Sequence, residues 1–413
     1  MSVETIQHID IEDIRSQFPV LHQEVNGKPL IYFDNAATSQ KPRRVIEALS
    51  HYYEQDNSNI HRGVHALAER ATNAYEKTRK NLAGFIHANE TEEVVFTKGT
   101  TDSINLVAQA YGRKFLTKDD AILITGMEHH SNIVPWQMLA QQTGASLLVA
   151  PITKEGEIIW EEFVSLFNDH NVKIVSTCYV SNTLGTINPV EDIITIAHEQ
   201  GAVVMLDGAQ ACPHINIDVK KLDVDFLGFS GHKMYGPTGV GILYGKRRLL
   251  EKMDPYQGGG EMIKDVSFEK TTYNDIPYKF EAGTPNIADV VAWNEAVNFM
   301  DDIGIERLAE HEQALLEYAS AKLRTIDGFD PLGTAKNKAS VISFNIDGIH
   351  PFDLGMFMDA GGVAIRTGHH CTQPIMDQFG LEGTARASFA VYNTFEEIDQ
   401  FVEVLNRTVK KFR

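Results

Sequence analysis

Short apolar runs rich in β-branched residues recur between residues 93 and 245, and they are EVVFTKG (93–99), AILITG (121–126), ASLLVAPI (145–152), VKIVSTCYVSN (172–182), AVVMLDGAQ (202–210), DFLGFSG (225–231) and GVGILYG (239–245). They do not alternate between apolar and polar positions, which predicts strands covered on both faces. Segments with helical periodicity, such as TDSINLVAQAYGRKF and VEDIITIAHEQG, separate the runs, and the second ends at Gly201 in a good C-cap position. This alternation predicts an α/β fold with a doubly wound, mainly parallel sheet.

The pattern changes after about residue 290. A long helical stretch over 288–326 leads into the strand-like runs VISFNID and VAIRTG, and the chain closes on the helical pattern TFEEIDQFVEVLNRTVKKF. This part is typical of a smaller α+β domain. The predicted division is an N-terminal segment over 1–30 that packs with the small domain, a large domain over 31–289 and the small domain over 290–413.

Composition excludes several classes of function. The 413 residues carry a formal net charge of −19, so neither nucleic acid nor an anionic membrane is expected as a main partner, because both need a basic face. The three cysteines form no disulfide framework, which favours a reducing compartment. The acidic N-terminus lacks the apolar region of a signal peptide, and no apolar run is long enough for a membrane span. A cytoplasmic location is therefore expected.

Polar residues that follow the predicted strands are the candidates for chemistry, because ligands of open α/β sheets bind beyond the carboxyl ends of the strands. In FTKGTTDSIN, Thr100 and Thr101 stand where a strand gives way to a helix, which suits an anion, although either threonine could equally cap the helix. Asp207 ends the strand of AVVMLDGAQ, with Gln210 three residues on. Its carboxylate could meet the protonated ring nitrogen of a cofactor or a nearby arginine.

The glycine-rich string FLGFSGHKMYGPTGVG carries Ser230, His232 and Lys233 after another strand. Lys233 in such a turn could be a Schiff-base amine or an exposed loop lysine. In MEHHSNIVPW, at most one of two adjacent histidines faces the same pocket, and His129 could stack on a planar cofactor or be structural. An anion site, a carboxylate, an imidazole and an amine together are what pyridoxal 5′-phosphate requires.

The string RTGHHCTQP allows three interpretations of Cys371, as a core thiol, a metal ligand or a nucleophile. A metal site is not expected, because three consecutive residues rarely reach one ion and no second pair has zinc-ligand spacing. Cys178 and Cys212 are most simply explained as core thiols.

Several long strings resemble the class V, fold type I pyridoxal-phosphate enzymes, above all LDGAQ (206–210) and SGHKMYGPTGVGILY (230–244). RTGHHC (366–371) and ARASFAVYNTFEEID (385–399) narrow the resemblance to cysteine desulfurases of the SufS type, or group II. It runs essentially end to end, through YFDNAATSQKP (32–42), NIHRGVH (59–65), VSNTLGTINP (180–189), GGGEMI (258–263) and EAGTPN (281–286). The resemblance implies the fold of the pyridoxal-phosphate-dependent transferases of type I.

The resemblance also implies a role for each matching residue. Lys233 would bind the cofactor aldehyde and shuttle protons, while Asp207 and Gln210 contact the ring and His129 stacks on it. The residues implied to hold the phosphate are Thr101, Ser230 and His232, with Thr284 from a partner subunit, and Thr100 is a further candidate for binding the cofactor. Asn182 would orient cofactor and substrate, Arg386 would clamp the substrate carboxylate, and Arg366 would assist there.

The implied reaction converts L-cysteine to L-alanine and leaves a persulfide on Cys371, whose thiolate His369, His370 and Arg366 could favour. The short spacing around Cys371 implies that the cysteine is held near the pocket and that a sulfur-acceptor protein of the SufE or SufU kind speeds turnover and leads to iron–sulfur cluster assembly. A homodimer is implied as well. The alternatives are a selenocysteine lyase acting on L-selenocysteine, another class V aminotransferase or lyase, and a non-enzymatic sulfur-relay scaffold.

Overall fold

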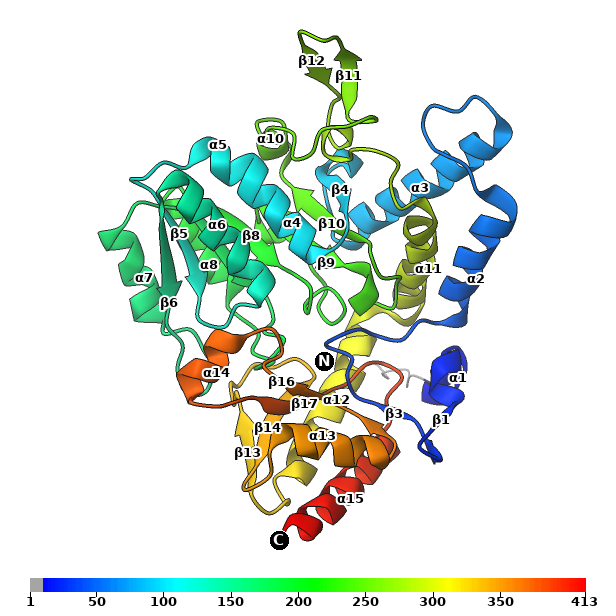
Figure 1. Cartoon of the computed structure of the whole chain (residues 1–413), viewed down its shortest axis with the longest axis vertical. Helices are drawn as coiled ribbons and strands as arrows, with labels where there is room; N and C mark the ends of the chain where they lie inside the picture. Colours follow the sequence, from blue (N-terminus) through cyan, green and yellow to red (C-terminus); the bar gives the residue numbers. More distant parts are fainter. Residues whose placement is uncertain (1–9) are drawn as a thin grey trace, which may run out of the picture.

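A seven-stranded sheet forms the centre of the computed structural model, which describes residues 10–413 (Figure 1). Its strand order is β4 (Val94–Thr97), β10 (Gly241–Gly245), β9 (Phe226–Ser230), β8 (Val203–Asp207), β7 (Val172–Cys178), β5 (Ala121–Thr125) and β6 (Ser146–Ala150). β10 runs antiparallel to both of its neighbours, and all other pairs are parallel. The seven predicted strands and the α/β fold class are confirmed.

The prediction that the strands are buried on both faces is confirmed for the inner strands and is wrong for β6. Every residue of β5, β8, β9 and β10 is buried. β6 lies at the edge of the sheet, where Ser146 is exposed and the Val149 side chain is 53% exposed. An edge strand has no neighbouring strand on one side, so part of it stays exposed. The apolar run in the sequence does not show that the strand lies at the edge of the sheet.

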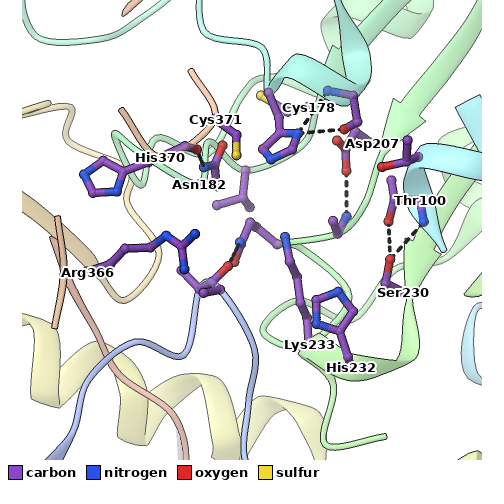
Figure 2. Close-up of a pocket in the computed structure, with 18 of the residues that line it drawn as sticks. Thr100, Cys178, Asn182, Asp207, Ser230, His232, Lys233, Arg366, His370 and Cys371 are labelled. Atoms are coloured by element: carbon purple, nitrogen blue, oxygen red, sulfur yellow. Dashed lines mark hydrogen bonds between the residues drawn. The ribbon is translucent and has the colours of Figure 1, made fainter. Parts of the chain in front are cut away.

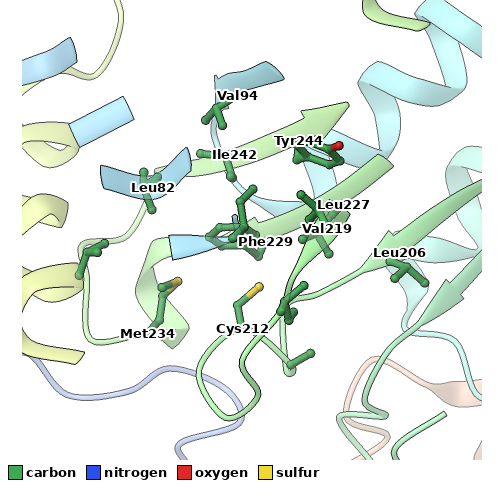
Figure 3. Packing of buried hydrophobic residues seen from close by; sticks show 14 of the residues in the cluster. Leu82, Val94, Leu206, Cys212, Val219, Leu227, Phe229, Met234, Ile242 and Tyr244 are labelled. Atoms are coloured by element: carbon green, nitrogen blue, oxygen red, sulfur yellow. The ribbon is translucent and has the colours of Figure 1, made fainter. Parts of the chain in front are cut away.

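Helices cover both faces of this sheet, and alternate strand residues point to the two sides. Leu206 packs with α3 (Ala66–Phe85), α7 (Trp160–Asp169), α8 (Val190–Glu199) and α11 (Ile287–Ile303), whereas its neighbour Met205 packs with α4 (Thr100–Leu106) and α6 (Val134–Thr143). Figure 3 shows the first cluster, in which Cys212 lies among Leu227, Phe229 and Ile242. Cys212 is therefore a core thiol, as predicted.

Two of the predicted helices differ in detail from the prediction. The helix expected over 101–115 consists of α4, a π-helical turn η4 (Val107–Gly112) and α5 (Arg113–Phe115). The stretch over 288–326 divides into α11 and α12 (Ile305–Leu323) at Gly304, whose φ of 89° breaks the helix. Gly201 follows α8 with φ of 74° and donates its N–H to the carbonyl of His198, which confirms the predicted cap.

The C-terminal part contains a second, antiparallel sheet in the order β13 (Phe329–Leu332), β14 (Val341–Ile346), β17 (Thr384–Ser388) and β16 (Arg366–Gly368). It packs with α12, α13 (Pro351–Ala360) and α15 (Phe395–Phe412) around one apolar cluster. α14 (Gln373–Phe379) follows the loop that carries Cys371.

The N-terminal segment lies against the C-terminal part at two places. Arg15 of α1 (Ile11–Ser16) donates to the Tyr392 carbonyl at 2.6 Å and pairs with Glu397 at 2.8 Å. β3 (Ile31–Tyr32) pairs in parallel with β15 (Val363–Ala364). The division at residues 30 and 289 stays a prediction, and residues 1–9 of the predicted segment lie outside the described residues.

The remaining elements are short, and a hairpin of β11 and β12 extends from the body of the molecule (Figure 1). They are η1 (Pro19–His22), β1 (Glu24–Val25), β2 (Lys28–Pro29), α2 (Arg43–His51), η2 (Tyr52–Asp56), η3 (Thr91–Glu93), η5 (His130–Asn132), α9 (Val219–Leu222), η6 (Gly231–Lys233), α10 (Arg247–Leu250), β11 (Ile263–Val266), β12 (Thr271–Tyr273) and η7 (Tyr278–Phe280). Over residues 10–413, no helix has the length and apolar character that a membrane crossing requires.

Candidate active site

A cavity of about 230 Å³ lies where the carboxyl ends of the central strands meet the C-terminal sheet (Figure 2). The predicted site residues that line it are Thr100, Thr101, His129, Asn182, Asp207, Gln210, Ser230, His232, Lys233, Arg366, Cys371 and Arg386. The sequence prediction therefore placed all but one of its candidates around a single cavity.

The start of α4 and the end of β9 form one polar corner of the cavity. The backbone N–H of Thr100 donates to the Ser230 hydroxyl at 2.8 Å, and the two side-chain oxygens lie 2.8 Å apart. Gly99 adopts φ of 145°, and a Cβ there would lie 3.1 Å from the Ser230 oxygen. Hydroxyls and backbone N–H groups crowded around a side-chain-free residue suit a phosphate group.

The buried Asp207 and the half-buried Lys233 carry opposite charges and line the same cavity. Burial raises the pKa of Asp207, although the nearby Lys233 opposes this rise. Burial also lowers the pKa of Lys233 to about 8, with Asp207 opposing the fall. A pKa of about 8 leaves part of the Lys233 amine neutral near physiological pH, so it can react there as a nucleophile.

The two imidazoles beside this pair are neutral. Burial, with Lys233 adding to it, lowers the pKa of His129 to about 3 and that of His232 to about 4. The N–H of Ser131 donates to Nδ1 of His129 at 3.1 Å, so the neutral ring carries its proton on Nε2. His130 does not line the cavity, which confirms that only one of the adjacent histidines faces it.

The segment from Asp34 to Ala37 closes one side of the cavity, and sequence reasoning gave it no role. Gln210 donates through Nε2 to the Ala36 carbonyl at 2.6 Å, which holds this segment against the end of β8. Ala36 and Ala37 line the cavity directly. The polar residues directly after the apolar run IYF were the available signal, because a change from apolar to polar marks a strand end.

Arg386 and Arg366 share one carboxylate, that of Asp34. Arg386 donates to Asp34 Oδ1 at 3.2 Å and to the Asn182 carbonyl at 2.9 Å, while Arg366 contacts Asp34 Oδ2 at 3.4 Å. Nε of Arg386 is buried and has no hydrogen-bond partner within the described residues. A buried donor left unpaired favours an acceptor brought by a ligand, and a carboxylate matches the guanidinium.

Cys371 faces the same cavity from the C-terminal part, with its sulfur directed toward the side where the Lys233 amine lies (Figure 2). It is exposed, unlike the buried Cys178 and Cys212, whose thiol pKa values burial raises well above the ordinary range. His370 and Cys371 have φ of 53° and 59°, and the Thr372 N–H donates to the His369 carbonyl at 2.9 Å. This is the geometry of a type I′ turn, which costs roughly 1 kcal/mol for each side chain other than glycine.

His370 does not supply positive charge to the thiol, contrary to the role that the sequence left open. Its ring is buried and lies 2.8 Å from the Thr384 hydroxyl. Burial, with Arg386 and Arg366 adding to it, lowers its pKa to about 2, so the ring is neutral. Arg366 lines the cavity and stays a candidate for that charge.

Thr284 is the one candidate that lies elsewhere, in a separate cavity of about 520 Å³ with Tyr75 and Asp102. Cys178 is a buried thiol as predicted, yet it also lines the main cavity at the end of β7. Over residues 10–413 no cluster of three histidine, cysteine or acidic side chains has the arrangement to hold a metal ion.

The family model described as "Aminotransferase class-V" matches residues 31–401, and the chain belongs to this family. A probable cysteine desulfurase of Halalkalibacterium halodurans is 50% identical, over 98% of this chain and 99% of its own length. Another, of Mycobacterium leprae, is 51% identical over 98% of this chain, which spans 66% of that relative. The solved structure of the cysteine desulfurase CsdA from Escherichia coli superposes with a TM-score of 0.90 at 38% identity, covering 98% of this chain and 100% of that one. Within class V, the chain belongs with the cysteine desulfurases.

Enzymes of this class use pyridoxal 5′-phosphate, and the residues of the cavity fit it. The corner of Thr100 and Ser230 suits the phosphate, the buried Asp207 suits a protonated ring nitrogen, and the free amine of Lys233 suits the aldehyde. The cofactor assigned to this chain is therefore pyridoxal 5′-phosphate.

Proposed function

We propose that this protein converts L-cysteine to L-alanine and keeps the sulfur as a persulfide on Cys371. The observation that carries the proposal is an exposed thiol and a half-buried amine that line one cavity, together with two arginines. The cofactor, when bound, supplies an electron sink for a carbanion at the substrate Cα. All remaining tasks belong to side chains of the chain.

Arg386 binds the substrate carboxylate, and its unpaired buried Nε supports this role. Lys233 removes the proton from Cα, since a pKa of about 8 leaves part of the amine neutral near physiological pH. His129 lines the same cavity and carries its proton on Nε2. In this proposal the imidazole of His129 would help to hold the cofactor ring, and its Nε2–H would supply a proton donor in the cavity.

Cys371 then attacks the substrate sulfur. The bond between Cβ and sulfur breaks, a sulfur–sulfur bond forms on Cys371, and the substrate carbon skeleton leaves as alanine after protonation at Cβ. One thiol and one cysteine thereby give one persulfide and one alanine, so no external oxidant is required. Asn182 supports the arrangement, because its side chain donates to the His370 carbonyl at 2.8 Å and its own carbonyl accepts from Arg386.

The decisive experiment is mass spectrometry of Cys371 after incubation with L-cysteine. We expect a gain of one sulfur, together with alanine in equal amount, in a protein that is yellow from its lysine-bound cofactor. Lys233→Ala should be colourless and inactive, and Cys371→Ser should retain the colour but form no persulfide. Persulfide formation at the wild-type rate in Cys371→Ser would contradict the assignment of the nucleophile.

The proposed partners are a second copy of the chain and a cytoplasmic sulfur-acceptor protein of the SufE or SufU kind, which passes the sulfur toward iron–sulfur cluster assembly. Thr284 supports the dimer, because it does not line the cavity of its own chain. Mixing Thr284→Ala with Lys233→Ala subunits should restore activity, because one site of the mixed dimer has both residues. If verified mixed dimers recovered no desulfurase activity, a site shared between subunits would be excluded. If the steady-state rate of alanine formation were the same with and without the acceptor protein, transfer of sulfur to that acceptor would be excluded.

A further inference from the structure

The turn that carries Cys371 is held from outside rather than by its own sequence. Its two central residues have left-handed backbone conformations, which His370 and Cys371 adopt at a cost and which a glycine would adopt freely. The flanking residues must therefore fix it, or the chain would relax to a different loop conformation.

His130 contacts this turn on both sides of the cysteine. Its backbone N–H donates to the Cys371 carbonyl at 2.7 Å, and its ring Nε2 lies 3.0 Å from the backbone N–H of Gln373. Since the Gln373 N–H can only donate, Nε2 of His130 must accept, and the neutral ring then carries its proton on Nδ1. The contact requires a hydrogen-bond acceptor at this place, not a positive charge.

The same short segment carries His129, which lines the cavity. Glu128, the preceding residue, is buried and accepts hydrogen bonds from Asn132 at 2.6 Å and from the Cys178 N–H at 2.9 Å. Glu128 also accepts from the Thr125 hydroxyl at the end of β5 at 2.5 Å, so the segment 128–130 is fixed to the ends of two central strands. Through His130, this fixed segment also determines where the Cys371 turn lies.

We infer that His130 is a positioning residue, which holds the Cys371 turn against the cofactor side of the cavity through its ring Nε2 and its backbone N–H. This inference rests on the proposed sulfur transfer, and it assigns to the second histidine of the pair a task separate from that of His129. Holding the sulfur in place before substrate arrives avoids the loss of rate that a displaced nucleophile would cause.

The test compares His130→Leu, which removes the acceptor, with His130→Gln, whose amide oxygen can accept from the same N–H. In holoenzyme without substrate, His130→Leu should speed amide hydrogen exchange in the segment 371–376 by roughly tenfold, the typical effect of one lost hydrogen bond. Its kcat for persulfide formation should fall by roughly ten- to a hundredfold, with KM for L-cysteine and the visible cofactor spectrum unchanged. His130→Gln should restore most of both properties, and His170→Leu, at an exposed histidine, should match the wild type.

The inference would be overturned if His130→Leu had the amide exchange rate and the kcat of the wild type. It would also be overturned if His130→Gln were as impaired as His130→Leu. Nitrogen NMR of selectively labelled wild-type protein gives an independent answer even if His130→Leu does not fold. A neutral ring with its proton on Nδ1 supports the inference, and a proton on Nε2 refutes it. If the wild type formed no persulfide from L-cysteine, the proposed function would fail, whereas the exchange and NMR measurements would still decide the positioning role.

Discussion

Acidification should destabilise the protein without its cofactor, because three histidines at the site are held neutral by burial. The pKa values are about 3 for His129, about 4 for His232 and about 2 for His370, against an ordinary value of about 6.5. Below that ordinary value the unfolded chain binds a proton at each histidine, whereas the folded chain does not. The stability they contribute is therefore complete above about pH 6.5 and is lost as the pH falls.

Buried carboxyl groups oppose this loss. Burial raises the pKa of Glu128 to about 7, so the folded chain binds a proton there before the unfolded chain does, and stability rises as the pH falls below 7. Three groups lose stability and one gains it, which leaves a net uptake of about two protons on unfolding between pH 6 and pH 5. At 1.36 kcal/mol for each proton and pH unit, the free energy of unfolding should fall by about 2.7 kcal/mol over this interval.

Four further groups shift in partly cancelling directions. The pKa of His130 is lowered, and the pKa values of Asp207, Asp301 and Glu397 are raised. Because more of these groups gain stability than lose it on acidification, the expected decrease is smaller than about 2.7 kcal/mol. Urea unfolding of the apoprotein, followed by tryptophan fluorescence at pH steps from 6 to 5, measures it.

The variant His370→Gln supplies the control for this slope. It removes one of the three neutral histidines, so it should reduce the decrease between pH 6 and pH 5 by about 1.4 kcal/mol, whatever its effect on stability at pH 7. A free energy of unfolding that is flat or rises over this interval in the wild type would refute the reasoning. An unchanged slope in His370→Gln would show that His370 is not held neutral.

Glu281→Gln should lower the free energy of unfolding by about 3 kcal/mol, because it removes the carboxylate 2.6 Å from the guanidinium of Arg79, whose side chain is 2% exposed. Urea unfolding measures this loss, and a value below about 1 kcal/mol would contradict the prediction. Gly241→Ala should destabilise by about 1–3 kcal/mol and weaken cofactor binding, because its Cβ would lie 2.4 Å from a backbone carbon of the neighbouring strand end. Gly258→Ala, with no atom within 4 Å of its Cβ, is the matched control in thermal melting. Asp207→Asn should lower the pKa of Lys233 in the apoprotein further, because the Asp207 carboxylate raises that pKa in the wild type. The pH dependence of Lys233 acylation measures the pKa. An unchanged midpoint would exclude the electrostatic effect of Asp207 on Lys233.

The half of the site that follows the central strands could be predicted from sequence, because strand order in a parallel sheet brings successive carboxyl ends to one edge. Thr100, His129, Asp207 and Lys233 each follow an apolar run, and the structure brings them together. Neither Arg386 nor Cys371 follows a strand of that sheet, and only the resemblance to a family predicted their place. Their positions depend on how the second sheet packs against the first.

Contacts between residues distant in sequence could not be predicted. Asp34 and Arg386 are 352 residues apart, and no local pattern shows that they pair. In the sequence, His130 is only the neighbour of His129. Its contact with the Gln373 N–H can be seen only in the folded structure, where the two segments meet. The neutral state of His370 likewise depends on the burial of its ring beside Thr384.

The distribution of charge in the cavity orients an amino acid substrate in the proposed reaction. With His129 and His232 neutral and the Lys233 amine bound to the cofactor in the proposed reaction, the remaining positive charge lies on Arg386 and Arg366, which share the single carboxylate of Asp34. A substrate carboxylate is drawn to that end, and its amino group then points to the cofactor side. The substrate side chain then remains to meet Cys371, which lines the same cavity as the two arginines.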